Sequence, residues 1–452
     1  MKVVTARQMR EADRRTIQAG TPGDELMLRA ATRVVEFLER EFAPLAEQRV
    51  VIFCGEGNNG GDGLVAGRLL EGRVAGLRIV RVSDAAPGPV DREATIVIDA
   101  LLGTGAREPL EGRYAELVSS INRDFPKAKV VAVDIPSALQ VRADYTVTFA
   151  APKAEMLLSP RAGNAGRLIV GDIGIPADFL PSGLNLSAPA DFAPLFQPRK
   201  PDSHKGDYGH VLVVGGAAGK TGAAAMAGLA ALRAGAGLVT VACSDPSRLA
   251  PELMTQPLAS PSLERMTVLA IGPGLGIERD LVSRLMSAAK TSTMSAAKIP
   301  IVIDADGLNS IAGTDFQGRG IATVLTPHPG EMARLTGVPV ADRVATAREF
   351  ATQRNVCLVL KGFRTLIAFP DGEAWINPTG SPALAKGGTG DILTGLIAGL
   401  IAQFPEDIGL AVRAAVWLHG RAGELAAVEL TDKCVLATDL LRYLPEAVRE
   451  CV

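Results

Sequence analysis

Short apolar runs alternate with segments of helical periodicity along most of this chain. Runs rich in valine and isoleucine, bounded by glycine or polar residues, predict strands buried on both faces at residues 49–54, 77–82, 95–99, 130–134, 211–214, 237–243, 267–271, 299–303, 324–326 and 356–360. Helices are predicted at residues 6–41, with a break at 20–23, and at 64–70, 223–234 and 392–402. This alternation predicts an α/β protein with parallel sheets, whose ligands bind at the carboxyl ends of the strands.

The length of the chain requires more than one core. For 452 residues, two or three domains are expected. A stretch between residues 176 and 201 is rich in proline, serine, alanine and asparagine and lacks sustained periodicity. We therefore predict a domain boundary near Phe196, which divides the chain into domains 1–196 and 197–452.

Composition narrows the class of protein. A formal net charge of −2 gives no support for a nucleic-acid partner or a membrane surface. The five cysteines have no metal-binding spacing, which fits reduced thiols in a cytosolic enzyme. The first residues lack the pattern of a signal peptide, and no uninterrupted apolar run reaches transmembrane length. We expect a cytoplasmic enzyme that acts on small molecules, has no nucleic-acid or membrane partner, and assembles as a homo-oligomer.

The clearest chemical signal is the glycine-rich stretch AKGGTGDILTG at residues 385–395, which leads into the predicted helix at 392–402. Such a loop can direct several backbone N–H groups at one anion, and the helix adds its positive end. Asp391 stands in the first turn of that helix, where a carboxylate can accept a proton from a hydroxyl that attacks a phosphoryl group. An aspartate here is also a common helix cap, so this stretch alone does not decide between the two roles.

Oxygen-bearing side chains gather at strand ends in the first half. The stretch GEGNNGGDG at residues 55–63 satisfies G-x-G-x-x-G, but a plain dinucleotide turn does not explain its two asparagines and its aspartate. Asp99, Asp134 and Ser137 follow two further strands. An aspartate at a strand end often caps a helix, but three such ends together favour a common site. An all-oxygen cluster of low charge would suit a hard, weakly bound cation.

These motifs resemble those of NAD(P)HX epimerases, which interconvert the R and S hydrates of NADH and NADPH. The resemblance covers residues 1–190 and rests on GNNGGDG (57–63), DALLGTG (99–105), VDIPS (133–137) and TVTF (146–149) with Lys153. It implies a Rossmann-like three-layer domain with potassium bound by Asn59, Asp99 and Ser137. Asp134 is the candidate for acid–base chemistry. The resemblance places the hydrate against Asn58, Asn59, Gly60, Gly61, Asp62, Gly103, Thr104, Gly105, Ala106, Arg107, Glu108, Pro109 and Asp134.

Two departures from the family pattern bear on the efficiency of the epimerase half. Ala138 replaces the glycine that usually follows Pro-Ser, and the loop after it is shortened. If residue 138 takes a positive φ, alanine strains the backbone by roughly 1 kcal/mol. The stretch LMLRAA at residues 26–31 also differs from the usual LMENAG. A non-catalytic N-terminal binding domain is therefore an alternative.

Ligand-type residues recur past the strand ends of the second half. Residues 215–221, GGAAGKT, suggest a P-loop, but Val214 stands where that motif requires glycine, so a Walker NTPase is rejected. His328 lies between two prolines, which suits a positioned contact, although a lone histidine is more often structural. His419, in an apolar stretch, is interpreted as a core or capping residue.

The second half resembles the ADP/ATP-dependent NAD(P)HX dehydratases, which have a ribokinase-like α/β fold. The resemblance begins near residue 200 and runs through HKGDYG (204–209), GPGLG (272–276), DAD (304–306), TPHPGE (326–331) and GGTGD (387–391) in the family's order. It implies that Ala223, Gly274, His328 and Asp391 contact the hydrate. It also implies that the nucleotide is lined by Lys361, Gly362, Phe363, Arg364, Thr365, Ser381, Pro382, Ala383, Leu384, Ala385, Lys386, Gly387, Gly388, Thr389 and Gly390. Lys386 is an addition to the family pattern, and we expect it to contact a phosphate or to point to solvent.

Together the two resemblances imply a bifunctional repair enzyme. The first half would equilibrate the epimers, and in the second Asp391 would deprotonate the hydroxyl of the S form as it attacks the terminal phosphoryl of ADP or ATP. Elimination of the phosphate ester would then regenerate NAD(P)H, with Mg²⁺ bridging the nucleotide phosphates. Fused members of the family are typically bacterial or archaeal and use ADP, so ADP is the expected donor, giving AMP and phosphate. The rival interpretation is a ribokinase-like small-molecule kinase of the hydroxyethylthiazole or pyridoxal type.

Overall fold

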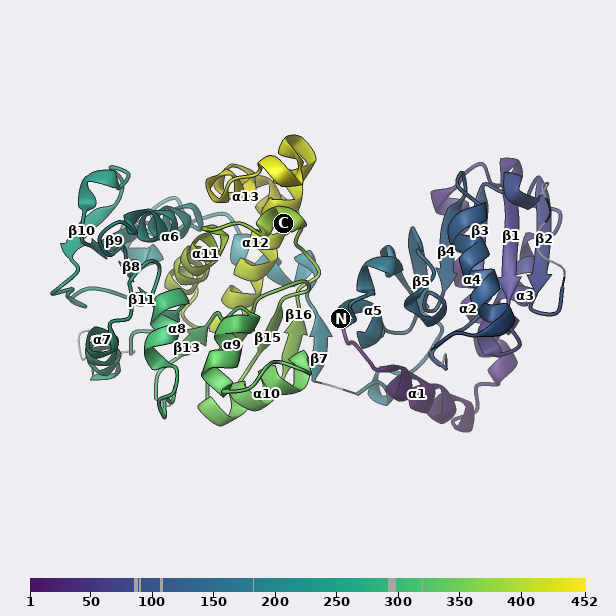
Figure 1. Cartoon of the computed structure of the whole chain (residues 1–452), viewed down its shortest axis with the longest axis horizontal. Helices are drawn as coiled ribbons and strands as arrows, with labels where there is room; N and C mark the ends of the chain where they lie inside the picture. Colours follow the sequence, from purple (N-terminus) through teal and green to yellow (C-terminus); the bar gives the residue numbers. More distant parts are fainter. Residues whose placement is uncertain (85–87, 89–90, 106–108, 182, 292–297, 319) are drawn as a thin grey trace. The chain divides into compact units, whose positions relative to one another are not determined.

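The structure, a computed structural model, describes residues 1–84, 88, 91–105, 109–181, 183–291, 298–318 and 320–452. The chain forms two compact units, Met1–Ser182 and Gly183–Val452, and each has its own sheet (Figure 1). Both sheets are mainly parallel and carry helices, so the predicted α/β class is confirmed. Within the described ranges, no helix combines the length and apolar character that crossing a bilayer demands.

The N-terminal unit contains a six-stranded parallel sheet in the order β2-β1-β3-β4-β5-β6. Its strands are β1 Arg49–Cys54, β2 Gly76–Arg81, β3 Ile96–Ala100, β4 Lys129–Val133, β5 Tyr145–Phe149 and β6 Arg167–Gly171. Its helices are α1 Ala6–Gln18, α2 Gly23–Glu41, α3 Asn58–Leu70, α4 Gly112–Asp124 and α5 Ala154–Leu158. The strand order reverses between β1 and β3, and open α/β sheets bind ligands at such a reversal.

Alternate residues of the buried strands contact two different layers of helices. Val50 and Ile52 of β1 belong to an apolar cluster with α2 and α3, whereas Val51 and Phe53 belong to a cluster with α4. Since both faces of the sheet are covered, the strands are continuous apolar runs in the sequence. The predicted three-layer arrangement is therefore confirmed.

The loop after β4 contains strained backbone. Ala138 is buried and has φ +49° and ψ +23°, in the left-handed region that disfavours residues with a Cβ atom. Leu139 follows with φ +52°. The positive φ considered for residue 138 is thus present, in a region that glycine adopts without a Cβ clash.

We expect Ala138→Gly to raise the free energy of unfolding of the N-terminal unit by about 1 kcal/mol, because glycine adopts this conformation without the Cβ clash. Far-UV circular dichroism in denaturant measures the change. Both tryptophans, Trp375 and Trp417, belong to the C-terminal unit, so their fluorescence transition is an internal control that should not move. A lower circular-dichroism midpoint would contradict the strain.

The C-terminal unit contains a ten-stranded sheet in the order β10-β9-β8-β11-β12-β13-β14-β15-β16-β7. Only β15 is antiparallel to its neighbours β14 and β16. The strands are β7 Leu184–Leu186, β8 His210–Val214, β9 Leu238–Cys243, β10 Met254–Pro257, β11 Val268–Ile271, β12 Ile301–Ile303, β13 Thr323–Leu325, β14 Cys357–Leu360, β15 Leu366–Ala368 and β16 Ala374–Ile376. The helices are α6 Thr221–Arg233, α7 Arg279–Thr291, α8 Ala305–Ile311, α9 Pro329–Thr336, α10 Arg343–Arg354, α11 Thr389–Gln403, α12 Ile408–Cys434 and α13 Leu440–Arg449.

The structure divides the chain after residue 182, earlier than the predicted boundary at residue 196. Leu184 of β7 pairs with Ala374 of β16, and Phe192 and Leu195 enter the core of the C-terminal unit. Two prolines of this stretch, Pro189 and Pro194, lie in a short 3-10 helix, Pro189–Phe196, and do not mark a linker. Composition is misleading here because the strand partner of β7 lies far along the chain.

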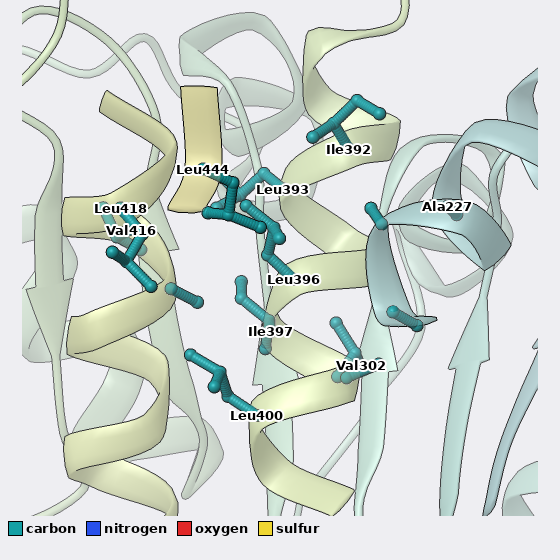
Figure 2. Close-up of a cluster of buried hydrophobic side chains, with 14 of the residues drawn as sticks. Ala227, Val302, Ile392, Leu393, Leu396, Ile397, Leu400, Val416, Leu418 and Leu444 are labelled. Carbon is teal, nitrogen blue, oxygen red and sulfur yellow. The ribbon is translucent and has the colours of Figure 1, made fainter. Parts of the chain in front are cut away.

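Helix α11 lies at the centre of the C-terminal core. Every residue from 392 to 402 is buried, and the helix packs against α6, α12 and the sheet (Figure 2). A Cβ on Gly395 would lie 2.1 Å from the Ala227 carbonyl oxygen, and one on Gly399 would lie 2.5 Å from that of Ala231. Glycine at these positions lets α6 and α11 approach closely, so the start of α11 is held by dense packing.

Candidate active sites

The first candidate site lies where the glycine-rich loop enters α11. Gly388 precedes the helix with φ +96°, and no side chain of the described residues caps the helix start. The Thr389 hydroxyl lies 2.9 Å from two carbonyl oxygens, those of Leu384 and Lys386, and this contact folds the loop back on itself. The first N–H groups of α11 therefore have no side-chain acceptor, as an anion-binding helix start requires.

Asp391 lies half-buried in the first turn of α11, as its spacing predicts. Burial raises the pKa of its carboxyl group to about 7. The charges of Asp304 and Asp306 contribute to this raised pKa, and the charge of Lys361 opposes it. A carboxyl group with a pKa near neutrality can exchange a proton with a bound hydroxyl at physiological pH.

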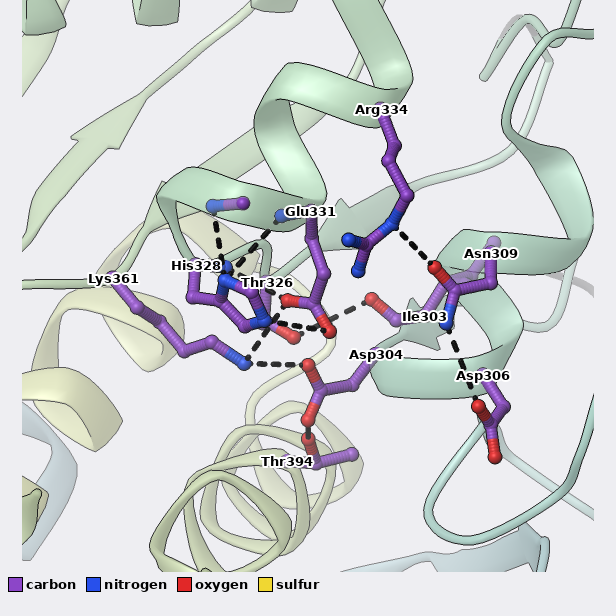
Figure 3. A network of polar contacts seen from close by, with 11 residues as sticks. Ile303, Asp304, Asp306, Asn309, Thr326, His328, Glu331, Arg334, Lys361 and Thr394 are labelled. Atoms are coloured by element: carbon purple, nitrogen blue, oxygen red, sulfur yellow. Dashed lines mark hydrogen bonds and ion pairs between the residues drawn. The ribbon is translucent and has the colours of Figure 1, made fainter. Parts of the chain in front are cut away.

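Lys361 lies half-buried beside this helix start, next to the carboxylates of Asp304 and Glu331 (Figure 3). Lys361 Nζ donates to Asp304 Oδ1 at 2.7 Å and lies 3.8 Å from Glu331 Oε2. The buried Asp304 also accepts a hydrogen bond at 2.8 Å from the Thr394 hydroxyl of α11. Burial by itself would lower the pKa of Lys361, but Asp304, Glu331 and Asp391 outweigh it and raise the pKa. Lys361 therefore stays charged and joins α11 to the ends of β12 and β14.

His328 is the N-cap of α9. Its Nδ1 accepts hydrogen bonds from the N–H groups of Gly330 and Glu331, and its own backbone N–H donates to the Glu331 carboxylate at 2.8 Å. Because Nδ1 is an acceptor, the proton of the neutral ring is on Nε2. The ring is half-exposed, so it can cap the helix and still offer Nε2–H to a ligand.

The remaining residues predicted to contact the hydrate lie at a neighbouring turn. Gly274 has φ +60°, and a Cβ there would lie 3.1 Å from the Cβ of Ala223, near the start of α6. Lys220, which precedes this helix, lies 3.4 Å from Asp306. Since Asp306 acts electrostatically on Asp391, the structure brings the Gly274 turn and the start of α11 to one end of the sheet.

A cavity of about 450 Å³ opens beside the start of α11. Its volume lies in the range of small-molecule sites. Of the residues predicted to bind ADP, it is lined by Lys361, Gly362, Phe363, Arg364, Thr365, Ser381, Pro382, Leu384, Ala385, Thr389 and Gly390. It is not lined by Ala383, Lys386, Gly387 and Gly388.

The ammonium group of Lys386 is engaged elsewhere. Nζ donates to the carbonyl oxygens of Lys433 and Val435, each at 2.6 Å, at the C-terminal end of α12. In this structure the ammonium group is thus bound by the chain itself, and its contact with a phosphate stays a prediction. A cation at a helix C-terminus is favourable because unpaired carbonyls gather there.

His419 of α12 lines the cavity, although its sequence context indicates only a core or capping role. Its Nε2 lies 2.9 Å from the Thr389 carbonyl oxygen, which can only accept, so Nε2 carries the proton. Burial lowers the pKa of His419 to about 4, so the ring is neutral and steadies the first turn of α11. This contact depends on the packing of two helices and has no local sequence signal.

The second candidate site lies at the ends of β3 and β4 in the N-terminal unit. Asp99 is fully buried and accepts hydrogen bonds from the N–H and hydroxyl groups of Ser137, at 2.8 and 2.6 Å. Burial raises the pKa of Asp99, and the bonds from Ser137 and the Leu101 N–H oppose that rise. Asn59 is also buried, and neither carboxamide atom has a hydrogen-bond partner among the described residues.

The three residues predicted to bind potassium meet at the loop after β3. The N–H of Leu102 donates to the Ser137 hydroxyl at 2.9 Å, and a Cβ on Gly103 would lie 3.3 Å from the Cβ of Asn59. A carboxamide oxygen without a partner and a buried carboxylate are oxygen ligands that suit a hard cation. The arrangement therefore fits a bound cation.

Asp134 is held by a buried lysine. It has φ +65°, and its carboxylate forms an ion pair with Lys153 Nζ. The same ammonium group donates to the Thr148 hydroxyl at 2.9 Å and to the Phe149 carbonyl at 3.2 Å. Lys153 is inaccessible to solvent, so the TVTF motif and this lysine together position Asp134.

The charge of Asp134 acts on two further carboxyl groups. Burial raises the pKa of Asp62 to about 8, with additional contributions from the charges of Asp134 and Asp13. Burial and Asp134 likewise raise the pKa of Asp13 to about 6. Asp13 lies on α1, which its sequence marks only as a charged amphipathic helix, so its place in this site becomes visible only after folding.

Part of the predicted hydrate-binding set surrounds this site. Ala106, Arg107 and Glu108 lie outside the described residues, whereas Gly103, Thr104, Gly105 and Pro109 belong to the loop after β3. The described residues contain no group of three histidine, cysteine, aspartate or glutamate side chains arranged to hold a metal ion. A cation in this unit would therefore depend on carboxamide, hydroxyl and backbone oxygens as well as Asp99.

Both halves of the chain match known families. A family model described as NAD(P)H-hydrate dehydratase matches residues 211–446. A second model, described as YjeF-related protein N-terminus, matches residues 23–94 and 73–155.

Whole-length relatives combine the two halves. The bifunctional NAD(P)H-hydrate repair enzyme Nnr of Moorella thermoacetica is 38% identical over 99% of this chain and 97% of its own length. The enzyme of the same description from Escherichia coli is 32% identical over 94% of this chain and 89% of its own length. The crystal structure of the Bacillus subtilis ADP/ATP-dependent NAD(P)H-hydrate dehydratase, co-crystallised with ATP and Mg²⁺, is 37% identical. It covers 59% of this chain and 99% of its own, with a TM-score of 0.54.

Proposed function

Because the chain belongs to the family of bifunctional NAD(P)H-hydrate repair enzymes, we propose that Asp391 is the catalytic base of its dehydratase half and Asp134 a proton-transfer group of its epimerase half. The protein epimerises R- and S-NAD(P)HX and dehydrates the S form to NAD(P)H. The proposal concerns the residues that perform these reactions and the nucleotide that drives the second one.

The position of Asp391 carries the proposal for the dehydratase half. Its carboxyl group lies in the first turn of a helix whose N–H groups are open to an anion, beside a cavity of nucleotide size. Asp391 takes the hydroxyl proton of the hydrate as the oxygen attacks the terminal phosphoryl group of ADP, and AMP leaves. The phosphate ester then loses phosphate and a proton from the adjacent ring carbon, which restores the double bond. Phosphorylation of the hydroxyl makes this elimination possible, because hydroxide is a poor leaving group and phosphate is a good one.

Mg²⁺ fits this site as an ion that enters with the nucleotide. Magnesium keeps several waters and is usually held by phosphates with one or two carboxylates, so no dedicated protein cluster is required. Asp304 and Asp306, whose charges act on Asp391, are the carboxylates that would complete its shell. The ion would supply positive charge against the phosphate oxygens during transfer.

The experiment that tests both activities supplies the full chain with an R/S mixture of NADHX, ADP and Mg²⁺ and follows dihydronicotinamide absorbance. Full recovery of NADH shows that both halves are active, whereas recovery of only the S fraction shows dehydratase activity without epimerase activity. A phosphorylated product that persists would instead support the small-molecule kinase. AMP formed from ADP identifies the donor, whereas ADP formed from ATP alone would overturn the choice of ADP. Pure R hydrate without nucleotide tests the epimerase by itself, and no S form would mean a non-catalytic N-terminal domain.

The dehydratase should respond to pH as its base titrates. Since the pKa of Asp391 is about 7 and only the carboxylate accepts a proton, kcat/KM should rise with pH through 7 and then level. At pH 6 we expect roughly one tenth of the plateau value, because about that fraction of the group is ionised. Initial rates with pure S hydrate at fixed ionic strength measure the profile. A profile that falls with pH over this range would exclude Asp391 as the base.

We also propose potassium at Asn59, Asp99 and Ser137. The support is a fully buried carboxylate next to a buried carboxamide whose atoms have no hydrogen-bond partner in the described part of the chain. A bound K⁺ would supply the charge that keeps Asp99 ionised there.

Potassium should stabilise the N-terminal unit in a way that depends on Asn59. We expect KCl to raise the circular-dichroism melting midpoint of this unit relative to choline chloride of equal ionic strength, since a ligand that binds only the folded state stabilises it. Asn59→Ala should lose the difference, whereas Asn122→Ala, at the exposed side chain of α4, should keep it. An equal K⁺ effect in the Asn59 variant would place the ion elsewhere.

The homo-oligomer and the cytoplasmic location stay predictions.

A further inference from the structure

One wall of the cavity beside the start of α11 is a short hairpin loop. Residues 361–365 connect β14 to the antiparallel strand β15, and all five line the cavity. Gly362 and Phe363 are exposed, so no hydrophobic core holds the middle of the loop. Gly362 has φ +140° and Arg364 has φ +53°. A non-glycine residue in the left-handed region is uncommon, so other contacts must hold Arg364 in this conformation.

Arg343, the first residue of α10, supplies those contacts. Its Nη1 donates to the Phe363 carbonyl oxygen at 2.7 Å, and its Nη2 donates to the Arg364 carbonyl oxygen at 3.3 Å. A Cβ on Gly362 would lie 3.4 Å from Nη2, so the guanidinium group lies against three successive residues of the loop. Arg343 is not among the residues that line the cavity. It therefore acts on the loop and not on a ligand of the cavity.

The guanidinium group of Arg343 has no counter-ion in the described part of the chain. The side chain is half-buried, and its Nε is buried without a hydrogen-bond acceptor among the described residues. Burial accordingly lowers the pKa of Arg343. A half-buried cation without a carboxylate partner costs stability, so its two bonds to the loop indicate a role beyond folding.

The two bound carbonyl groups fix the directions of two N–H groups. In a trans peptide, the N–H points opposite to the carbonyl of the preceding residue. The carbonyls of Phe363 and Arg364 point to Arg343, so the N–H groups of Arg364 and Thr365 point away from it. Neither N–H has an acceptor among the described residues. Successive free N–H groups at a left-handed turn form a concavity that suits an anion.

We propose that Arg343 is a positioning residue, which turns the N–H groups of Arg364 and Thr365 toward the oxygen atoms of a bound nucleoside diphosphate. The inference rests on the proposed nucleotide site and adds to it a residue that does not touch the nucleotide. Because Arg343 acts through the loop, it changes the affinity for the nucleotide and not the rate of phosphoryl transfer.

The test compares Arg343→Met and Arg343→Lys with the wild type in the full chain, with S hydrate, ADP and Mg²⁺. Methionine removes both donors, so the KM for ADP should rise by about tenfold or more. Lysine lacks the planar fork that bonds two carbonyls at once, so its KM should lie between those of Arg343→Met and the wild type. Because Asp391 and the start of α11 are unchanged, kcat at saturating ADP and the KM for the hydrate should stay within about threefold.

Equilibrium binding of ADP in the absence of hydrate gives a readout that needs no turnover. The Kd of Arg343→Met should rise by the same factor as its KM. Arg354→Met, at the last residue of the same helix, is the matched control. Arg354 also donates to a backbone carbonyl, that of Phe316 at 3.1 Å, but it pairs with Asp315 and does not line the cavity. This variant should keep the KM and Kd of the wild type for ADP.

Two results would overturn the inference. One is an Arg343→Met enzyme whose KM and Kd for ADP lie within about threefold of the wild-type values. The other is a loss in kcat at unchanged KM, which would show that the residue supports folding or chemistry and not nucleotide binding. If Arg343→Met does not fold, Arg343→Lys decides by the same criteria. A wild-type chain that binds ADP but does not convert the hydrate would overturn the proposed function, and the Kd comparison would still decide the role of Arg343.

Discussion

Asp391→Asn is expected to abolish the recovery of NADH from S-NADHX, with a loss in kcat of at least about 10³-fold. Asparagine keeps the size of the side chain and its place in the first turn of α11, but it cannot accept the hydroxyl proton. The absorbance assay with pure S hydrate, ADP and Mg²⁺ measures the loss. Epimerisation of the R hydrate by the other unit should continue at its normal rate.

The same substitution should leave the fold at least as stable as before. The pKa of Asp391 is about 7 in the folded state and 3.8 in the reference state, so the folded protein holds this proton more tightly. The free energy of unfolding of the wild type therefore falls as pH rises from about 4 to 7. The variant has no carboxyl group at this position, so its free energy of unfolding does not fall for this reason. Asp280→Asn removes an exposed carboxylate from the first turn of α7 and is the matched control, with full activity expected. Near-normal turnover in the Asp391 variant would remove this residue from the mechanism.

Lys361→Met is expected to destabilise the C-terminal unit by roughly 3–5 kcal/mol and to eliminate dehydratase activity. The substitution leaves Asp304, whose side chain is 2% exposed, without its cation, and removing one partner of a buried ion pair has costs of this size. Glu331 and Asp391 lose the same positive charge. The fluorescence of Trp375 and Trp417 in denaturant reports the unfolding of this unit alone.

The pH dependence and a second substitution identify the cause of that loss. Protonation removes the charge of the carboxylates that have lost their cation, and a neutral carboxyl group costs less to bury. The difference in the free energy of unfolding between wild type and Lys361→Met should therefore shrink as pH falls. Adding Asp304→Asn should restore part of the stability without restoring activity. Lys220→Met, which breaks an exposed pair with Asp306, should cost less than about 1 kcal/mol. Equal losses in the two lysine variants would argue that burial of the Lys361 pair is unimportant.

Much of the fold was accessible from local patterns. Runs such as residues 49–54 are apolar at every position because both faces of a parallel strand are covered, and this signal needs no knowledge of the partner strand. The glycines before α11 and the position of Asp391 in its first turn follow from turn and helix chemistry within about ten residues. The order of motifs along the chain led to the two-part family that whole-length relatives confirm.

The electrostatics and the composition of both sites depend on contacts between distant residues. Asp13 joins Asp134 and Lys153 only because α1 docks beside the loop after β5, and β7 joins the C-terminal sheet only because it pairs with β16. The pKa of a carboxyl group rises when folding removes its water and brings other charges near, and neither event is written in the neighbouring residues. The sequence by itself therefore determined the main buried strands, the presence of two halves and the position of Asp391. The tertiary structure alone decided which charges share a site, because burial and long-range pairing set their energies.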